Sequence, residues 1–337
     1  MTETAQAPRL VADVGGTNAR FALSAGAGEF TAVRVLACQQ FATIAEAITH
    51  YLEGAGNPPV RDVVIAIATP VLGDEVRMTN HNWSFSIEAT RRALRLRTLL
   101  VVNDFAALAM SLPFLEDAQL RRLDNHRETR HGVKAVIGPG TGLGVAGLVP
   151  VPHGWQPIAT EGGHASFSPA TPLETEILQL VWKTHPHVSA ERLVSGIGIP
   201  LLYHALCTIA GAPARPEGDD AAGVVALAEA GSCPTAQQTL GVFSAMLGGF
   251  AGNVALTFGS TGGLYIGGGV VGRLGRHFDA GAFRARFLAK GRFAAYLEAV
   301  PNYLILAEQP AFLGAARQLE QHLATLAGGR HAGATAT

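Results

Sequence analysis

Asp13-Val-Gly-Gly-Thr-Asn18 is the stretch of this chain that decides its fold. It lies between two short apolar runs, Leu10-Val-Ala12 and Ala19-Arg-Phe-Ala-Leu23. Apolar runs on both sides of a glycine pair predict a strand, a tight turn and a second strand. Glycine lets backbone N–H groups crowd around phosphate oxygens, and the threonine adds a hydroxyl donor. The stretch is therefore a candidate phosphate-binding turn.

A second turn of the same build is Gly138-Pro-Gly-Thr-Gly-Leu-Gly144. Ala135-Val-Ile137 precedes it and Val145-Ala-Gly-Leu-Val149 follows it, so strand, turn and strand are predicted here too. Each turn alone could be an ordinary hairpin with flexible residues. Two turns of one build could clamp one polyphosphate, and their pairing favours a nucleotide site.

Two better-known nucleotide motifs do not fit. The second turn has the spacing Gly140-x-Gly142-x-Gly144, which differs from the dinucleotide fingerprint, and a strand-like run follows it instead of a helix. A Walker loop needs a lysine just after its glycines, and none of the lysines stands there: Lys134, Lys183 and Lys290. A Rossmann domain is therefore a poor fit, and a Walker loop is excluded.

The composition is that of a globular protein. Its 337 residues, 48% hydrophobic and 15% charged, can bury a substantial core and form two domains around a cleft. The net charge of -1 gives no basic field for nucleic acid or an anionic membrane. Three well-separated cysteines suit a reducing compartment, and the N-terminus lacks the pattern of a secretory signal. We expect a cytoplasmic protein without nucleic-acid or membrane partners.

One long stretch, between Glu229 and Arg273, carries no charged residue. Glycines and polar residues interrupt it, so we expect a buried helix over Thr235–Phe258 rather than a membrane span. A strand over Leu264–Ile266 and the turn Gly267-Gly268-Gly269 follow. That third glycine turn is either a wall of the nucleotide site, against base or ribose, or a plain strand-to-helix turn.

Strand and helix signals alternate elsewhere, as in an α/β protein. We expect central buried strands at Val63-Val-Ile-Ala-Ile-Ala68 and Leu99-Leu-Val-Val102, flanked by helices over Ile44–Leu52 and Glu88–Leu94. A terminal helix is expected over Glu308–Thr325, because its leucines are spaced for one helical face.

Proline and acidic residues cluster at Pro113-Phe-Leu-Glu-Asp117, which marks a domain boundary. We expect a small α/β domain over residues 1–114, completed by a C-terminal helix at about 305–330. A large α/β domain is expected over residues 115–304.

Asn103-Asp104 stands at the end of a predicted strand, where open α/β sheets place reactive groups. A carboxylate hydrogen-bonded to a hydroxyl can align it with a γ-phosphate and accept its proton late, so Asp104 is a candidate catalytic base. The competing interpretation is a helix N-cap, because Asp104 precedes the apolar run Phe105–Leu112. Position alone does not separate the two.

Glu161-Gly-Gly-His164 brings a carboxylate and an imidazole together, and Glu191 lies in a short amphipathic run. Such groups donate and accept in fixed directions, so they can discriminate vicinal sugar hydroxyls. No further His or Cys stands at ligand spacing around His164, which excludes a zinc site. The alternative is two solvated carboxylates and a histidine satisfied by its own loop.

Seven motifs stand in one order over nearly the whole chain, from about residue 10 to the Pro310-x-x-x-Gly314 region. They are Asp13-Val-Gly-Gly-Thr-Asn-Ala-Arg20, Met78-Thr-Asn-His-Asn-Trp83, Val102-Asn-Asp-Phe105, Gly138-Pro-Gly-Thr-Gly-Leu-Gly144, Glu161-Gly-Gly-His164, Ser189-Ala-Glu-Arg192 and Gly262-Gly-Leu-Tyr-Ile-Gly-Gly-Gly269. In this order they resemble the bacterial glucokinase family. The resemblance implies the actin-like ATPase (ribonuclease H-like, hexokinase-type) α/β fold, with two domains flanking a cleft.

The resemblance also implies an activity, ATP-dependent phosphorylation of D-glucose at its 6-hydroxyl to glucose 6-phosphate, at the entry to glycolysis. It makes Asp104 the catalytic base. The implied glucose-binding residues are Asn103, Asp104, Glu161, His164 and Glu191. The implied ATP phosphate-binding residues are Asp13, Gly15, Gly16, Thr17, Asn18, Gly140, Thr141 and Gly142.

By the same resemblance, Asp13 would hold Mg²⁺ through water, and the protein would be a homodimer. A related branch carries a cysteine-rich zinc motif after its Glu-Gly-Gly-His-like segment. Residues 165–187 contain no cysteine, so the zinc-free branch fits better.

Three alternatives stay open. A kinase for another hexose, such as mannose, fructose or N-acetylglucosamine, would share every phosphate loop. A non-catalytic sugar sensor would be expected to carry a helix-turn-helix ahead of the strand that opens by Leu10. An actin- or chaperone-like ATPase gives no reason for Asn103-Asp104 together with Glu161-Gly-Gly-His164.

Overall fold

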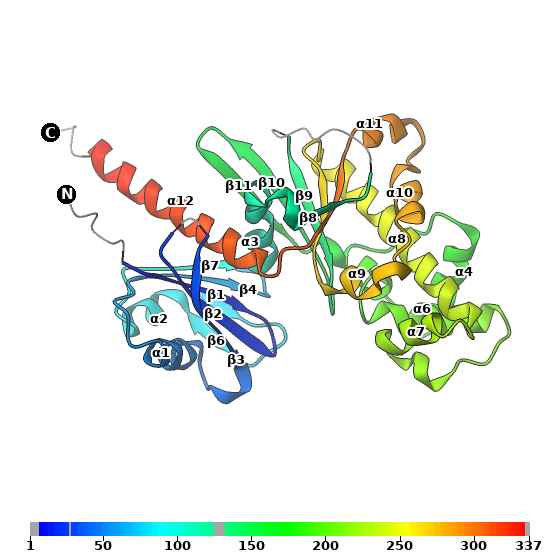
Figure 1. Cartoon of the computed structure of the whole chain (residues 1–337), viewed down its shortest axis with the longest axis horizontal. Helices are drawn as coiled ribbons and strands as arrows, with labels where there is room; N and C mark the ends of the chain where they lie inside the picture. The colour runs from blue at the N-terminus through cyan, green and yellow to red at the C-terminus, as the bar shows by residue number, and fades with distance from the viewer. Residues whose placement is uncertain (1–6, 27, 125–131, 334–337) are drawn as a thin grey trace. The chain divides into compact units, whose positions relative to one another are not determined.

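The computed structural model describes residues 7–26, 28–124 and 132–333, with side chains up to residue 327 (Figure 1). These residues divide into two compact units. Unit 1 spans Met1–Leu115, Val151–Ala159 and Ala307–Thr337, and unit 2 spans Glu116–Pro150 and Thr160–Leu306. Both units combine strands with helices, so the predicted α/β class is confirmed.

Unit 1 is built on a five-stranded sheet whose strands lie in the order β3-β2-β1-β4-β7. The first two strands of the chain form an antiparallel hairpin around the first glycine turn, as predicted, and β1, β4 and β7 run parallel. The strands are β1 (Arg9–Val14), β2 (Asn18–Ser24), β3 (Phe30–Ala37), β4 (Asp62–Ile67) and β7 (Thr98–Asn103), with a separate hairpin of β5 (Glu75–Arg77) and β6 (Ser84–Ser86).

The sheet of unit 1 has an apolar core on each face. Alternate residues of a strand point to opposite faces, and in β4 Val63 and Ile65 join the core beside α1, whereas Val64 joins the core beside α12. The expected helices over Ile44–Leu52 and Glu88–Leu94 are confirmed. The helices of unit 1 are α1 (Ile44–Gly54), α2 (Ile87–Ala93), α3 (Asp104–Ser111) and α12 (Pro310–Gly333).

One of the two strands expected at the centre of the sheet lies at its edge. β4 is central and all six of its residues are buried, but β7, which contains Leu99–Val102, pairs only with β4. Leu99 and Val101 pack into one core and Leu100 and Val102 pack against the other. Because both faces of β7 are covered, its sequence is as apolar as that of a central strand.

The terminal helix α12 begins at Pro310, later than residue 305 or 308 as expected from the sequence. Proline suits the first turn of a helix because its missing N–H has no partner there in any case. The helix lies along α3 (Figure 1), and Gly314 faces the backbone oxygen of Ala107 so closely that a Cβ would overlap it. Glycine at position 314 therefore lets the two helices approach.

Unit 2 contains most of a six-stranded sheet, in the order β11-β10-β9-β12-β13-β8, whereas residues 154–159 of β11 are counted with unit 1. β9 and β10 are antiparallel around the second glycine turn, which confirms the second predicted hairpin. The strands are β8 (Leu120–Arg122), β9 (Lys134–Pro139), β10 (Leu143–Val151), β11 (Gly154–Thr160), β12 (Leu264–Ile266) and β13 (Asn302–Ile305). The helices are α4 (Pro172–Val181), α5 (Ala190–Leu193), α6 (Gly198–Ile209), α7 (Ala221–Glu229), α8 (Pro234–Phe258), α9 (Gly269–Leu274), α10 (Ala280–Leu288) and α11 (Ala294–Glu298).

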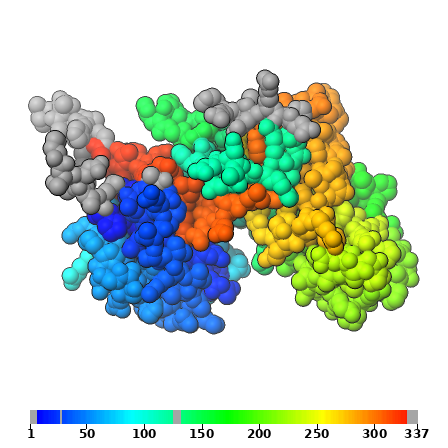
Figure 2. Space-filling view, viewed as in Figure 1, coloured from blue at the N-terminus to red at the C-terminus, as the bar shows by residue number. Residues whose placement is uncertain are grey.

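Helix α8 is the core helix that the uncharged stretch predicts. Among the described residues it alone has the length and apolar composition of a membrane span. Its buried side chains join the main core of unit 2 together with residues of α6, α7 and α10. Gly248 and Gly252 face the backbone oxygens of Phe283 and Phe287, so glycine brings α10 close to α8. The surface of α6 and α7 forms the yellow-green part of unit 2 in Figure 2.

Candidate functional site

The first glycine turn, in unit 1, is held by its own backbone. The N–H of Gly15 donates to the oxygen of Asn18 at 3.0 Å, and the N–H of Cys38 donates to the oxygen of Thr17 at 2.9 Å. A Cβ on Gly16 would lie 2.8 Å from the Cβ and the backbone oxygen of Asn80. Main-chain packing therefore fixes this turn, while the side chain of Thr17 stays exposed.

Asp13 is the penultimate residue of β1, close to this turn, and pairs with Arg20, whose Nη1 lies 3.2 Å from its carboxylate. Burial raises the pKa of Asp13, and the charge and hydrogen bond of Arg20 offset only part of this effect. A carboxylate in this condition is stabilised by an added cation.

Asn103 and Asp104 lie where β7 ends and α3 begins. The helix cap is Asn103 rather than Asp104, because the Oδ1 of Asn103 accepts the N–H of Ala106 at 3.0 Å. The N-cap interpretation of Asp104 is therefore wrong. Asp104 occupies the first helical position, where its Oδ1 accepts the N–H of Phe105 at 2.8 Å, and it is half-buried. Asn is a favoured cap, and its extended backbone turns the chain from strand to helix.

The second glycine turn, in unit 2, is held from outside. Within the turn, the N–H of Gly140 donates to the oxygen of Gly142 at 2.8 Å. The N–H of Gly196 donates to the oxygen of Gly140 at 2.8 Å, and the Oε2 of Glu191 accepts the N–H of Leu143 at 2.8 Å. A carboxylate assigned to the sugar thus also supports the candidate phosphate turn.

Glu161, His164 and Glu191 come together in unit 2. The 3₁₀ turn Gly162–His164 follows Glu161, and α5 carries Glu191. Nε2 of His164 is 4.0 Å from Oε2 of Glu161, and Nδ1 is 3.7 Å from Oε1 of Glu191. These separations exceed hydrogen-bond length, so each ring nitrogen and its facing oxygen remain able to bind a hydroxyl. The arrangement fits a polyol.

The comparisons with known proteins identify the family of the chain. A family model described as Glucokinase matches residues 10–322. The chain belongs to the glucokinase family. It is 46% identical to a glucokinase of Neisseria meningitidis over 94% of this chain and 96% of that one.

The chain is also similar to longer proteins. It is 51% identical to a protein of Burkholderia pseudomallei named "Bifunctional protein glk", over 97% of this chain. The chain spans about half the length of that relative, since the match covers 51% of it.

Solved glucokinase structures share the fold. The structure of a glucokinase from an Antarctic psychrotroph aligns with a TM-score of 0.85 at 36% identity, over 93% of this chain and 99% of that one. A glucokinase from Balamuthia mandrillaris, in complex with glucose, aligns with a TM-score of 0.77 over 95% of each chain. At 18% identity, this second likeness concerns the fold alone. The predicted fold of this glucokinase-family chain is confirmed.

The third glycine turn of this family member lies against the second. The N–H of Gly267 donates to the oxygen of Ile137 in β9 at 2.8 Å. Gly268 has a φ of +76°, and a Cβ there would lie 2.5 Å from the oxygen of Pro139. Gly269 begins α9, so the turn does connect a strand to a helix. Its position next to β9 is also compatible with a nucleoside wall, which stays a prediction.

Two supporting groups carry no signal in the sequence. Asn80 belongs to a motif quoted above without a role, and its contact with Gly16 joins two segments distant in the chain. The N–H of Leu143 is a backbone group, which no residue type reveals.

Proposed function

We propose that this chain is an ATP:D-glucose 6-phosphotransferase. The observation that carries the proposal is Glu191, whose two carboxylate oxygens face two different groups. Oε1 faces His164 in the candidate sugar group, and Oε2 accepts the N–H of Leu143 in the candidate phosphate turn. A residue that joins a polyol-binding group to a phosphate-binding turn suits a sugar kinase better than an ATPase that moves a partner.

In the proposed reaction each residue has the role that the family resemblance implies. The sugar O6 attacks the γ-phosphorus, the bond from that phosphorus to the β,γ-bridging oxygen breaks, and ADP leaves. Asp104 accepts the O6 proton as the new bond forms. Asn103, Glu161, His164 and Glu191 bind the other hydroxyls, and the two glycine turns bind the phosphates through backbone N–H groups.

Mg²⁺ is part of the proposal, and the chain's residues fit it. Among residues 7–26, 28–124 and 132–327, no group of three His, Cys, Asp or Glu side chains could hold a metal ion. Mg²⁺ in kinases typically needs only one or two carboxylates besides substrate phosphates. Asp13 provides a carboxylate beside the first turn, and burial makes an added cation favourable there. When bound, the ion would neutralise charge on the transferred phosphoryl group.

The direct experiment is an ADP-release assay with Mg·ATP and, in turn, glucose, mannose, fructose, N-acetylglucosamine and no sugar. We expect strong turnover with glucose and little without sugar. If another hexose gave the higher turnover, the proposed kinase activity would stand and that hexose would be the substrate instead of glucose. Release without any sugar would indicate a motor-type ATPase, and sugar binding without turnover would indicate a sensor.

Asp104→Asn tests the base. We expect kcat to fall by a factor of about 10³ or more, since an amide cannot accept the proton, while the glucose Kd changes little. Asp220→Asn is the control, because Asp220 is exposed, caps α7 by accepting the N–H of Gly223, and Asn caps equally well. A kcat within tenfold of wild type in Asp104→Asn would remove Asp104 from this role.

Two further parts of the proposal are a homodimer, which the family resemblance implies, and a cytoplasmic location, which the three well-separated cysteines favour. Light scattering on the purified full chain tests the first. Fractionation of cells that express the chain tests the second.

A further inference from the structure

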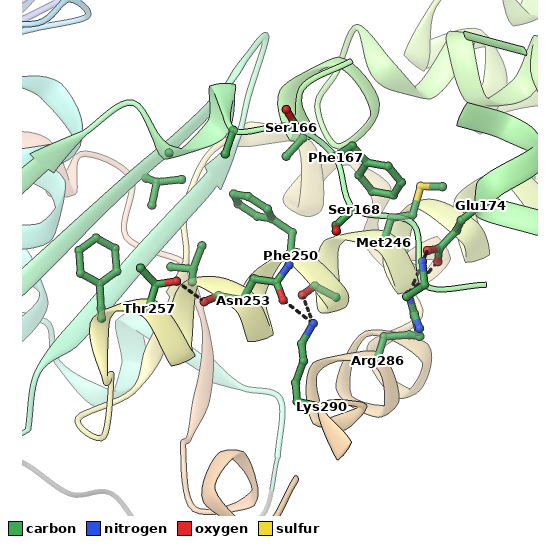
Figure 3. A pocket seen from close by; sticks show the side chains of 18 of the residues that line it. Ser166, Phe167, Ser168, Glu174, Met246, Phe250, Asn253, Thr257, Arg286 and Lys290 are labelled. Atoms are coloured by element: carbon green, nitrogen blue, oxygen red, sulfur yellow. Dashed lines mark hydrogen bonds and ion pairs between the residues drawn. The ribbon is translucent and has the colours of Figure 1, made fainter. Parts of the chain in front are cut away.

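Unit 2 contains a cavity of about 390 Å³ between α8, α10 and the segment that follows Gly162–His164 (Figure 3). The side chains of Met246, Phe250 and Val254 on α8, with Phe167 opposite, give it an apolar body. Glu161, His164 and Glu191 are not among its lining residues. The cavity is therefore distinct from the candidate sugar group, and we name it the α8–α10 pocket.

Hydrogen-bond donors gather along one side of the α8–α10 pocket. Figure 3 shows Lys290, in the turn after α10, beside Asn253 of α8, and Arg286 of α10 beside Glu174. Nζ of Lys290 donates to the oxygen of Gly249 at 2.9 Å and to Oδ1 of Asn253 at 2.6 Å, which leaves its third proton. That interaction with Oδ1 leaves the amide N–H₂ of Asn253 as a further donor.

Arg286 supplies a second positive charge. Its Nη2 donates to both carboxylate oxygens of Glu174 at 2.9 and 3.1 Å. Its Nε is buried and has no hydrogen-bond partner among the described residues. Because this nitrogen is closed to solvent, an occupant of the pocket would interact with the charge of the guanidinium rather than with this donor.

The charged side chains that line the pocket carry a net positive charge. The ionised groups that line the pocket are Glu174, Arg286 and Lys290, two cations against one anion. Burial, and then the charge of Arg286, lower the pKa of Lys290, so its ammonium is less stable here than in water. The charge of a bound anion would offset this cost.

We propose that the α8–α10 pocket binds a small organic anion with an apolar body. The anionic end accepts from Lys290 and Asn253 near the positive charge of Arg286, and the body packs on Phe250 and Met246. The volume lies in the usual range for small-molecule sites, and an apolar lining with a few convergent polar groups is typical of them.

The pocket shares a wall with the candidate sugar group. Gly162, Ala165 and Ala190 line it, and these residues neighbour Glu161, His164 and Glu191 in the sequence. The N–H of Ala190 donates to the oxygen of Ala165 at 2.8 Å, which ties the two segments together. An occupant therefore changes the glucose affinity, a coupling that rests on the proposed function.

The probe is 8-anilinonaphthalene-1-sulfonate, an aromatic anion whose fluorescence rises in apolar surroundings. The full chain is titrated with saturating glucose and Mg·ADP, which occupy the proposed catalytic site. We expect one bound probe per chain. No saturable binding to the folded chain would overturn the proposal.

Lys290→Met keeps the apolar stem and removes the charge. We expect it to weaken probe binding by at least about tenfold, the usual size of a lost charge-assisted hydrogen bond, whereas Lys290→Arg retains most of the affinity. Lys183→Met is the control, since Lys183 is exposed and outside the pocket lining. Thermal unfolding identifies any variant that fails to fold. Equal binding by wild type and a folded Lys290→Met would overturn the site.

The coupling has a separate readout. At saturating probe, we expect the glucose KM of wild type to shift at least about threefold, which corresponds to a weak allosteric coupling. The same probe concentration should leave the KM of Lys290→Met unchanged. An unshifted wild-type KM would overturn the coupling. Probe binding needs no turnover, so the site is tested even if the chain proves not to be a glucose kinase.

Discussion

The two glycine-threonine turns have the same residue pattern but different supports. In the first, Gly16 packs on the backbone and Cβ of Asn80, and Thr17 is bonded to the backbone of Cys38. In the second, the side chain of Glu191 accepts from Leu143 and stands against Gly142. The first turn is thus fixed by main-chain packing and the second by a carboxylate that also faces His164.

The two turns have the same residue pattern, but their different supports predict different responses to a ligand. A turn fixed by backbone has one conformation whether or not ligand is present. A turn that depends on a side chain changes when that side chain binds something else. We infer that sugar binding at Glu191 alters the second turn and leaves the first unchanged.

Gly16→Ala has the largest expected effect. The added Cβ would lie 2.8 Å from backbone and Cβ atoms of Asn80, and backbone cannot move aside cheaply. We expect kcat/KM to fall about 100-fold through misplacement of the turn, with a lower Tm. Steady-state kinetics and thermal unfolding measure the two.

Gly15→Ala is the matched control, because its Cβ would meet only the oxygen of Asn18 at an ordinary 3.6 Å. Its Tm should stay near that of wild type. A Gly16→Ala variant as stable as Gly15→Ala would mean that Asn80 does not fix the first turn.

Glu191→Ala should have a smaller effect that spreads to both substrates. Removal of the carboxylate takes away a proposed sugar-binding group and the acceptor of the Leu143 N–H. We expect the KM values for glucose and for ATP each to rise about tenfold, the size of one lost charged hydrogen bond. Initial rates over a grid of both substrates give the two values.

Glu161→Ala is the control for this coupling. Glu161 faces His164 at 4.0 Å but has no contact with the second turn among the described interactions, so only the glucose KM should rise. Gly142→Ala tests the same coupling through the turn itself. Its added Cβ would displace the Glu191 carboxylate, so we expect this variant to raise the KM values for both glucose and ATP. An ATP KM that Glu191→Ala leaves unchanged would contradict the inference.

Much of this architecture follows from local sequence, and the predictions that were wrong concern contacts between segments far apart in the chain. Hairpins around both glycine turns and the core helix α8 were predictable, because glycine placement and apolar runs act over a few residues. Strand order is not local. The edge position of β7 depends on which strands pair, and its apolar sequence reflects the helices that cover it.

The candidate site divides in the same way. The sequence and family resemblance identified Glu161, His164 and Glu191, and the structure brings these three together. The cap at Asn103 was missed because both Asn and Asp are good caps and only backbone geometry separates them. The contact between Asn80 and Gly16 was missed because it joins segments far apart in the chain.

Asp13→Asn has the smallest expected effect on stability. Unlike most substitutions, we expect it to raise the stability of the fold at neutral pH. Burial raises the pKa of Asp13 above its unfolded value, so the ionised form is the costly one. Stability from this group is complete below the unfolded pKa and is lost as the pH rises through the folded pKa. At neutral pH the amide should therefore raise the Tm, by about 2–4 °C for each kcal/mol of ionisation cost removed.

Asp62→Asn is the contrasting variant in the same sheet. Burial would raise the pKa of Asp62, but the hydrogen bonds and charge of Arg97 lower it overall. Its contribution is present above the unfolded pKa and is lost as the pH falls through the folded pKa, so Asp62→Asn should destabilise at neutral pH and approach wild type in acid. Denaturant unfolding of both variants from pH 3 to 8 separates the two signs. If Asp13→Asn proved less stable than wild type at neutral pH, Arg20 would already outweigh burial, and Asp13 would have no need of a second cation such as Mg²⁺.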